Sequence, residues 1–242
     1  MRFSPIIDNN ALCEPSRTVY VISVTYNSFH ALEILVLIPQ RTSLTIRGNF
    51  NPFVFSPDWM EAQGLVTPNG AIKLTLGAVW NGVQCQVEGR EWVVDQNSLA
   101  IRSQTFDKKL GDIAKSVLSL LPHTPVFSIG STFTFATSDE SDFSSLIPVL
   151  GQTRLTNLSD ADSQEPDLVR WGLVFHQSDT RVDMSVSVGS NGVTATLSYF
   201  SKIESPDRKI ASEKALASCG QYDSHFQSSQ KLVAKILSSR LS

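Results

Sequence analysis

The chain is dominated by short runs in which apolar residues alternate with polar ones, a pattern typical of β-strands with one buried face. β-Branched and aromatic residues, which favour strands, are frequent in these runs. In one run, residues 126–136, we expect Phe127, Ile129, Phe133 and Phe135 on one face. The strands that we predict cover residues 18–26, 32–39, 42–50, 72–80, 83–87, 99–101, 126–136, 167–176, 181–188 and 193–200.

Two longer segments carry the spacing of amphipathic helices instead. Residues 107–121 and about 210–241 place apolar residues at three- and four-residue steps, which gathers them into one stripe. Asp107 is a candidate cap of the first helix, and Pro122 ends it. In the second helix Gly220 is a candidate break.

A short third helix is predicted over residues 55–64 from its end signals. Ser56 is a candidate N-cap, and Pro57 occupies the first helical position, where no amide donor is missed. Gly64 fits the left-handed position that closes a helix.

Two Asn-Gly dipeptides lie between predicted strands. The type I′ turn of a two-residue hairpin needs positive φ at both central residues, which Asn and Gly tolerate best. We therefore predict hairpin turns at Asn81-Gly82 and at Asn191-Gly192.

The order of these elements predicts an α+β protein with antiparallel meander sheets and helices packed on one face. Strand–strand–strand–helix occurs twice, which suggests two structural modules. We expect an N-terminal α+β module at residues 1–136 and a C-terminal meander plus helix at 168–242. An acidic connector at residues 137–167 separates them, and the two modules are expected to pack as one globular unit.

Composition excludes several classes of protein. The chain has 242 residues, of which 41% are hydrophobic and 18% charged, too apolar for a disordered chain. It contains no apolar run long enough for a transmembrane helix, and its first residues lack the apolar core of a signal peptide. The net charge of −3 argues against a dominant nucleic-acid footprint.

The cysteines give an expectation about compartment. Cys13, Cys85 and Cys219 are far apart, and an odd number makes a poor disulfide framework. We expect free thiols in a reducing environment, and therefore a cytoplasmic protein.

The sequence lacks the usual motifs of catalysis and metal binding, so we expect no metal and no cofactor. It contains no CxxC, HExxH, glycine-rich phosphate loop or GxSxG element. None of the four histidines has another His or a Cys within four residues. His123, between two prolines, is either a proton carrier on a rigid loop or part of a stiff helix-to-strand corner.

Residues 121–135, LPHTPVFSIGSTFTF, with the amphipathic helix before them and the final meander plus helix, resemble small uncharacterised bacterial proteins of sporadic distribution. The resemblance covers a small part of the chain. It implies no known activity, so no functional residue is carried over from it.

These observations favour a non-enzymatic protein that binds another protein, or a second copy of itself, in a larger assembly. Exposed strand edges and aromatic anchors are common ways to recruit partners. In the aromatic segment 50–59 we predict Phe53, Phe55 and Trp59 as partner-binding residues, although core packing would explain the same pattern.

Two other functions stay open from the sequence. The first is an enzyme whose site is assembled from His123, Arg170, His176 and Asp183, brought together across the sheet. The second, less favoured, is nucleic-acid binding through lysines of the two long helices, with stacking aromatics. The candidate stacking residues are Trp171, Tyr199 and Phe200.

Overall fold

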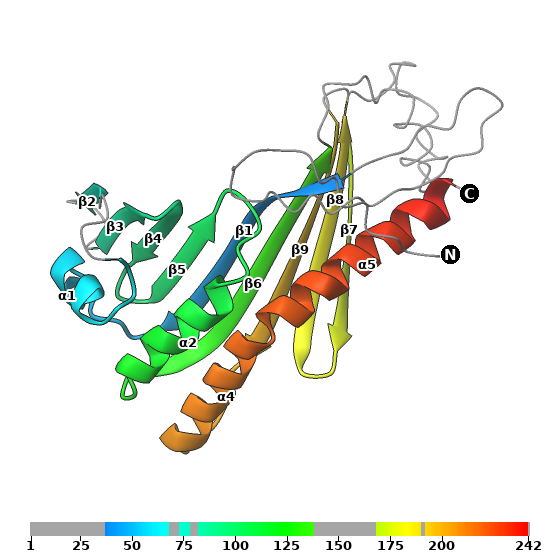
Figure 1. Cartoon of the computed structure of the whole chain (residues 1–242). Coiled ribbons are helices and arrows are strands. Elements are labelled where there is room, and N and C mark those ends of the chain that lie inside the picture. The colour runs from blue at the N-terminus through cyan, green and yellow to red at the C-terminus, as the bar shows by residue number, and fades with distance from the viewer. Residues whose placement is uncertain (1–36, 68–72, 78–81, 138–167, 190–191, 242) are drawn as a thin grey trace, which may run out of the picture.

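The computed structural model describes residues 37–67, 73–77, 82–137, 168–189 and 192–241. Its strands form one nine-stranded sheet in the order β2-β3-β4-β5-β1-β6-β9-β8-β7, and every neighbouring pair is antiparallel. The helices lie across one face of this sheet (Figure 1). The α+β class, with antiparallel sheet and helices on one face, is therefore confirmed.

The element bounds follow the hydrophobic pattern closely. The strands are β1 (Leu37–Gly48), β2 (Lys73–Gly77), β3 (Gly82–Val87), β4 (Arg90–Val94), β5 (Ser98–Ser103), β6 (Val126–Thr137), β7 (Leu168–Gln177), β8 (Thr180–Gly189) and β9 (Gly192–Lys202). The helices are the 3₁₀-helix η1 (Pro52–Val54), α1 (Pro57–Ala62), α2 (Leu110–Leu120), α4 (Arg208–Gly220) and α5 (Tyr222–Leu241).

Strand β6 connects the two predicted modules in one sheet. It pairs along one side with β1 and along the other with β9, and the β6–β9 register runs from Ser128↔Lys202 to Ala136↔Thr194. The meander β7–β8–β9 thus extends the sheet that begins with β1–β5. A single apolar core under α2, α4 and α5 spans both modules.

The covered face of the sheet holds the core because side chains alternate along each strand. On β6 the buried residues are Ile129, Ser131, Phe133 and Phe135, and Thr132 and Thr134 between them face away from the helices. Phe127, predicted on the same face, is 52% exposed near the start of the strand. Phe133 is fully buried, and its ring lies 5.1 Å from that of Tyr222 and 5.6 Å from that of Phe226. α5 therefore closes the core over the centre of the sheet.

Helix α2 buries its predicted stripe. Leu110, Ala114, Val117 and Leu118 are buried. The helix begins later than predicted, at Leu110, because the Asp107 carboxylate accepts the backbone N–H of Lys109 in the turn before it.

The helix at 57–62 forms as its end signals predict. The Ser56 hydroxyl accepts the Trp59 backbone N–H at 3.3 Å, Pro57 opens the helix, and Gly64 adopts φ +67° just beyond it.

The C-terminal helical segment breaks between α4 and α5, at the predicted glycine. α4 ends at Gly220, and α5 begins at Tyr222. Gly111 of α2 approaches this junction so closely that an added Cβ would lie 2.8 Å from the Cys219 carbonyl oxygen and 2.9 Å from the Tyr222 Cβ. The missing side chain at Gly111 therefore lets α2 and the α4–α5 junction pack against each other.

One predicted interruption is wrong: the described end of the strand expected at 32–39 and most of the strand expected at 42–50 form a single strand, β1, whereas residues 32–36 lie outside the described part. The strand passes through Pro39 with a register shift against β6 between Pro39 and Arg41, whereas pairing with β5 begins only at Thr42. A proline lacks the N–H of a ladder, and a β-bulge beside a one-sided stretch of strand accommodates it.

The two predicted Asn-Gly turns include Asn81 and Asn191, which lie outside the described residues. The hairpins on either side of them form, because Gly77 pairs with Gly82 and Gly189 pairs with Gly192. A further two-residue turn lies at Glu88-Gly89, between β3 and β4, where φ is +51° and +75°.

Several predictions concern residues outside those that the structure describes. These are the strand at 18–26, Cys13, and the acidic connector apart from Thr137, which ends β6.

Candidate interaction edge

Strand β7 forms one edge of the sheet. Its ten residues, LVRWGLVFHQ, pair with β8 from Leu168↔Gly189 to Gln177↔Thr180, and no other described strand lies beside it. Alternate residues of an antiparallel strand turn their N–H and C=O groups to opposite sides. β7 contains no proline, so every residue that faces the free side carries both groups.

The edge strand is apolar on both faces of the sheet, unlike its neighbours. Leu173 lies on the covered face, opposite Met184, and is 46% exposed. Val174 lies on the open face, opposite Asp183, and is 62% exposed. These two adjacent side chains put apolar surface on both sides of one free strand edge.

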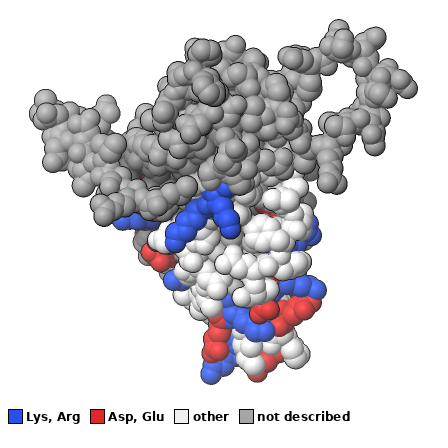
Figure 2. Space-filling view, turned by 90° about the vertical axis from the view of Figure 1, so that its right-hand side faces the viewer, with Lys and Arg blue, Asp and Glu red and all other residues white. Residues whose placement is uncertain are grey.

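The edge carries little charge. Arg170 is the only Lys, Arg, Asp or Glu in β7. Its Nε donates to the Ser187 hydroxyl at 3.1 Å, which holds the guanidinium over the neighbouring strand. Figure 2, which views the molecule from the right-hand side of Figure 1, shows Lys and Arg atoms at the border with the grey region, uncharged surface below them, and charges of both signs toward the lower end.

The open face of the sheet beside β7 is polar and is satisfied by its own cross-strand contacts. Arg181 and Asp183 of β8 form a two-bond ion pair at 2.8 and 3.0 Å. Thr132 of β6 and Ser198 of β9 are hydrogen-bonded at 3.0 Å. Around the exposed Phe200 of β9, this face therefore presents hydroxyl side chains and an ion pair, whereas Leu173 and Val174 place exposed apolar side chains next to each other at the edge strand.

The three aromatic residues predicted to bind a partner lie in different environments. Phe53 is 75% exposed, beside a shallow hollow of about 360 Å³ that Phe50 and Asn97 also line. Phe55 is 1% exposed, and its ring contacts those of Phe50 at 6.4 Å and Trp59 at 5.3 Å. Trp59 is half-buried, so Phe53 and one side of Trp59 are the surfaces that a partner could reach without opening the core.

The four residues of the enzyme hypothesis are not joined by the fold. His176, Asp183 and Arg170 lie on the open face of β7 and β8, and His123 lies at the corner after α2. Within the described part of the chain, no hydrogen bond or ion pair connects any two of them; Asp183 binds Arg181 instead.

His123 does line a hollow, of about 160 Å³, between the end of α2 and the start of α4. Its walls are mostly apolar, and Arg208, Ser205 and Ser212 also reach it. The nearby Asp207 carboxylate is already used to cap α4, where it accepts the Lys209 and Ile210 backbone N–H groups. The hollow thus brings a histidine and an arginine together, with no carboxylate or thiol in its lining.

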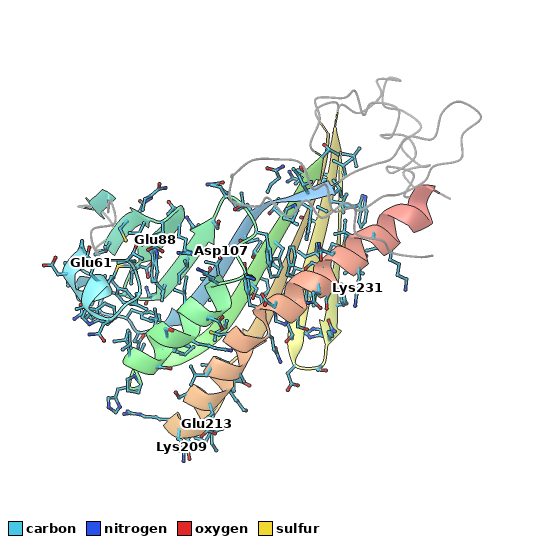
Figure 3. The ribbon with its side chains drawn as sticks, viewed as in Figure 1. Glu61, Glu88, Asp107, Lys209, Glu213 and Lys231 are labelled. Atoms are coloured by element: carbon cyan, nitrogen blue, oxygen red, sulfur yellow. The ribbon has the colours of Figure 1, made fainter. Side chains whose placement is uncertain are left out.

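The lysines and the exposed Phe200 predicted for nucleic acid lie on opposite sides of the sheet. Lys209 and Lys231 are exposed on α4 and α5, over the covered face (Figure 3). Phe200 is exposed on the open face, beside Gly130 of β6. Tyr199 is buried, and half-buried Trp171 faces the covered side. No described lysine row of these helices therefore shares a face with Phe200.

The described residues have a net positive charge, whereas the whole chain, on which the argument against nucleic acid rests, has a net negative one. Lys and Arg outnumber Asp and Glu by 17 to 13 in the described residues, whereas the whole chain has 20 and 23. The acidic excess is therefore confined to the residues outside the described part.

A small polar cluster is buried between β9 and α5. The Ser229 Oγ lies 3.1 Å from the Tyr199 hydroxyl and 2.8 Å from the His225 carbonyl oxygen. The His225 ring stacks on Tyr199 at 4.4 Å, and its buried Nδ1 finds no hydrogen-bond partner among the described residues. Burial lowers the pKa of His225 to about 4, so the imidazole is neutral and serves the packing of α5.

A second polar cluster fixes the segment before α2. The Arg90 Nε lies 2.6 Å from the Asp107 Oδ2, and the Arg90 Nη1 lies 2.8 Å from the Glu88 Oε2. Hydrogen bonds from the Thr67 side chain and backbone lower the pKa of Glu88. Figure 3 labels Glu88 and Asp107 at the β3–β4 turn and ahead of α2. The single positive charge of Arg90 is shared by two carboxylates, which is typical of a structural clamp.

The two described cysteines are poor nucleophiles. Burial raises the pKa of Cys85 to about 11 and that of Cys219 to about 12. No group of three or more His, Cys, Asp or Glu in the described ranges could hold a metal ion. Within those ranges, no helix has both the length and the apolar character needed to cross a membrane.

The sequence contained part of the signal for the β7 edge. The alternation of residues in this strand puts Trp171, Leu173 and Phe175 on one face and Val174 on the other. It did not indicate that this strand would be last in the sheet, because strand order depends on pairing between segments far apart in the chain.

Comparison with protein-family models gives no match, and comparison with curated proteins gives none. The likeness of residues 121–135 to small bacterial proteins stays a prediction. The evidence on function is therefore the geometry of the chain itself.

Proposed function

We propose that this chain is a non-enzymatic, protein-binding protein that recruits its partner by strand addition at the free edge of β7. An unpaired edge strand offers a ready row of N–H and C=O groups to any extended segment. Proteins that keep such an edge from pairing usually place lysines, prolines or a bulge on it, and β7 has none of these.

The single observation that supports this proposal most is the exposure of Leu173 and Val174 on opposite faces of that edge. A strand added beside β7 would cover both side chains and satisfy the free backbone groups together. Scattered exposed apolar residues are normal, but two adjacent ones on a free, ten-residue edge form a continuous binding strip. The buried thiols of Cys85 and Cys219 fit the cytoplasmic location that we propose with it.

The test is affinity capture with edge variants from cells that contain the protein. Leu173→Lys and Val174→Lys each place a charge on one side of the edge, and should lose a partner that the native chain retains. Ile210→Lys is the matched control, because Ile210 is 45% exposed on α4. Circular dichroism and thermal unfolding establish that each variant is folded. If the native chain and both edge variants retain the same proteins, strand addition at β7 is wrong.

A further inference from the structure

The free edge of β7 has the properties of a strand that can pair with its own copy. Ten residues of extended chain span roughly 33 Å, enough for a long antiparallel ladder. Antiparallel pairing of two identical strands is symmetric, so residue i of one copy faces residue j of the other, and j faces i. Every contact is then made twice.

Side chains across such a ladder match well when the two-fold axis passes Leu173. On the covered face Leu173 would lie opposite its own copy, and Trp171 of each chain would lie opposite Phe175 of the other. Cross-strand pairs of aromatic residues stabilise sheets. On the open face Gly172 would lie opposite Val174, so this exposed apolar side chain would meet a residue without one.

The charges of β7 allow this self-pairing and give no preference for a charged partner. Arg170 of one strand would lie opposite His176 of the other, and no acidic residue is present. The two Arg170 side chains would be six residues apart along the ladder, roughly 20 Å. That separation exceeds the Debye length of about 8 Å at physiological salt, so their repulsion is largely screened.

We infer that the β7 edge pairs with the β7 edge of a second copy of this chain, joining the two sheets antiparallel across a two-fold axis at Leu173. This inference rests on the proposed function, since it names the partner that occupies the proposed edge. Pairing β7 with β7 uses that edge in both copies, and the two-fold contact is complete once two copies have met; among the described strands, β2 then lies at each outer end. The assembly therefore closes as a dimer rather than growing into a fibre.

The first test is the mass of the full chain in solution, measured by size exclusion with light scattering over a range of concentrations. We expect a dimer whose dissociation constant rises at least tenfold in Leu173→Lys and in Val174→Lys. Ile210→Lys should leave the dissociation constant unchanged. A monomer at every concentration would overturn the inference. If that monomer still retains another protein through β7, the proposed function stands and only the second copy is wrong.

The second test places a crosslink on the proposed axis. In a Cys13→Ser background both remaining native cysteines are buried. Leu173→Cys should then give a disulfide-linked dimer under mild oxidation, because facing positions in an antiparallel ladder lie close enough for a bond. Ile210→Cys is the exposed control and should stay monomeric on a non-reducing gel. Equal crosslinking of both, or crosslinking through Gly172→Cys and not Leu173→Cys, would overturn this axis.

Discussion

β6 and β7 contain six apolar residues each, yet they have opposite roles in the sheet. In β6 the apolar residues alternate with hydroxyl side chains, and the strand lies at the centre with β1 and β9 beside it. In β7 they occupy both faces, and only β8 lies beside it. In β6 the apolar face is the one that the helices cover, so its apolar side chains form the core. In β7 apolar side chains lie on both faces of an edge strand, so some of them remain available to another chain.

The helices sharpen this contrast. α5 places Tyr222 and Phe226 over Phe133 of β6, whereas Leu173 on the same face of β7 stays nearly half exposed. The centre of the sheet is therefore specified by packing within the chain. The edge strand β7 has a strand partner within the described chain only on the side that faces β8.

The largest expected effect is on the centre. Phe133→Ala removes a fully buried ring that contacts Tyr199, Tyr222 and Phe226, and should lower the free energy of unfolding by about 3–5 kcal/mol. Urea unfolding followed by circular dichroism measures it. Leu173→Ala, at the edge, is the comparison and should cost far less. Equal losses for the two variants would contradict the distinction between centre and edge.

Two glycines provide a smaller, paired test. Gly111→Ala should destabilise the protein by about 1–3 kcal/mol, because the new Cβ would lie 2.8 Å from the backbone oxygen of Cys219. On an exposed helix the same change would stabilise by up to about 1 kcal/mol, so the sign is informative.

Gly172→Ala is the matched change at the edge. Its Cβ would meet one atom, the Met184 carbonyl oxygen, at 3.1 Å, and β7 has a free side toward which it can shift. We expect a change within about 0.5 kcal/mol. Thermal unfolding of both glycine variants at the same low concentration gives the comparison, and a stabilised Gly111→Ala would show that the junction is looser than described.

His225 gives the packing of α5 a pH dependence. Its pKa is lowered from 6.5 to about 4 in the folded chain, so the unfolded chain binds more protons between these values. Stability should therefore be complete above about pH 6.5 and should fall as the pH drops toward 4. After allowance for the partial solvent exposure of the ring, we expect a loss of about 1 kcal/mol.

The measurement is the free energy of unfolding at pH 7, 6 and 5 in the native chain and in His225→Phe. The variant should lose this part of the pH dependence, while His123→Asn, at an exposed position, should keep it. An unchanged pH profile in His225→Phe would mean that other groups cause it.

The smallest effect on stability is expected at the edge itself. Leu173→Lys and Val174→Lys should change the free energy of unfolding by less than about 0.5 kcal/mol at low protein concentration, because neither side chain is buried. Their effect should appear in association instead. Urea unfolding at the lowest usable concentration measures the first quantity and light scattering the second; a loss above about 2 kcal/mol would mean that β7 contributes to the core.

Much of the fold could be read from local patterns. The stripe of α2, the alternation in β6, the cap at Ser56 and the break at Gly220 are all encoded by neighbours within a few residues. The continuous β1 could not be predicted, because Pro39 is tolerated only where a bulge and a one-sided pairing happen to meet.

The candidate edge was only partly predictable for the same reason. Its apolar residues are visible in the sequence, and so is the absence of proline and acidic side chains. Their exposure depends on β7 being last in the strand order and on where the helices end over the sheet. The aromatic trio shows the reverse case: a run that looks uniform in sequence separates into exposed Phe53, half-buried Trp59 and buried Phe55.

By itself, the sequence determined which segments become strands and helices and which side of each is apolar, because backbone geometry fixes side-chain periodicity at 2 and 3.6 residues. Only the tertiary structure decided which strands are neighbours, where the sheet stops and which apolar side chains remain uncovered. Those outcomes depend on contacts between residues far apart in the chain, such as β6 with β9, which no local pattern contains.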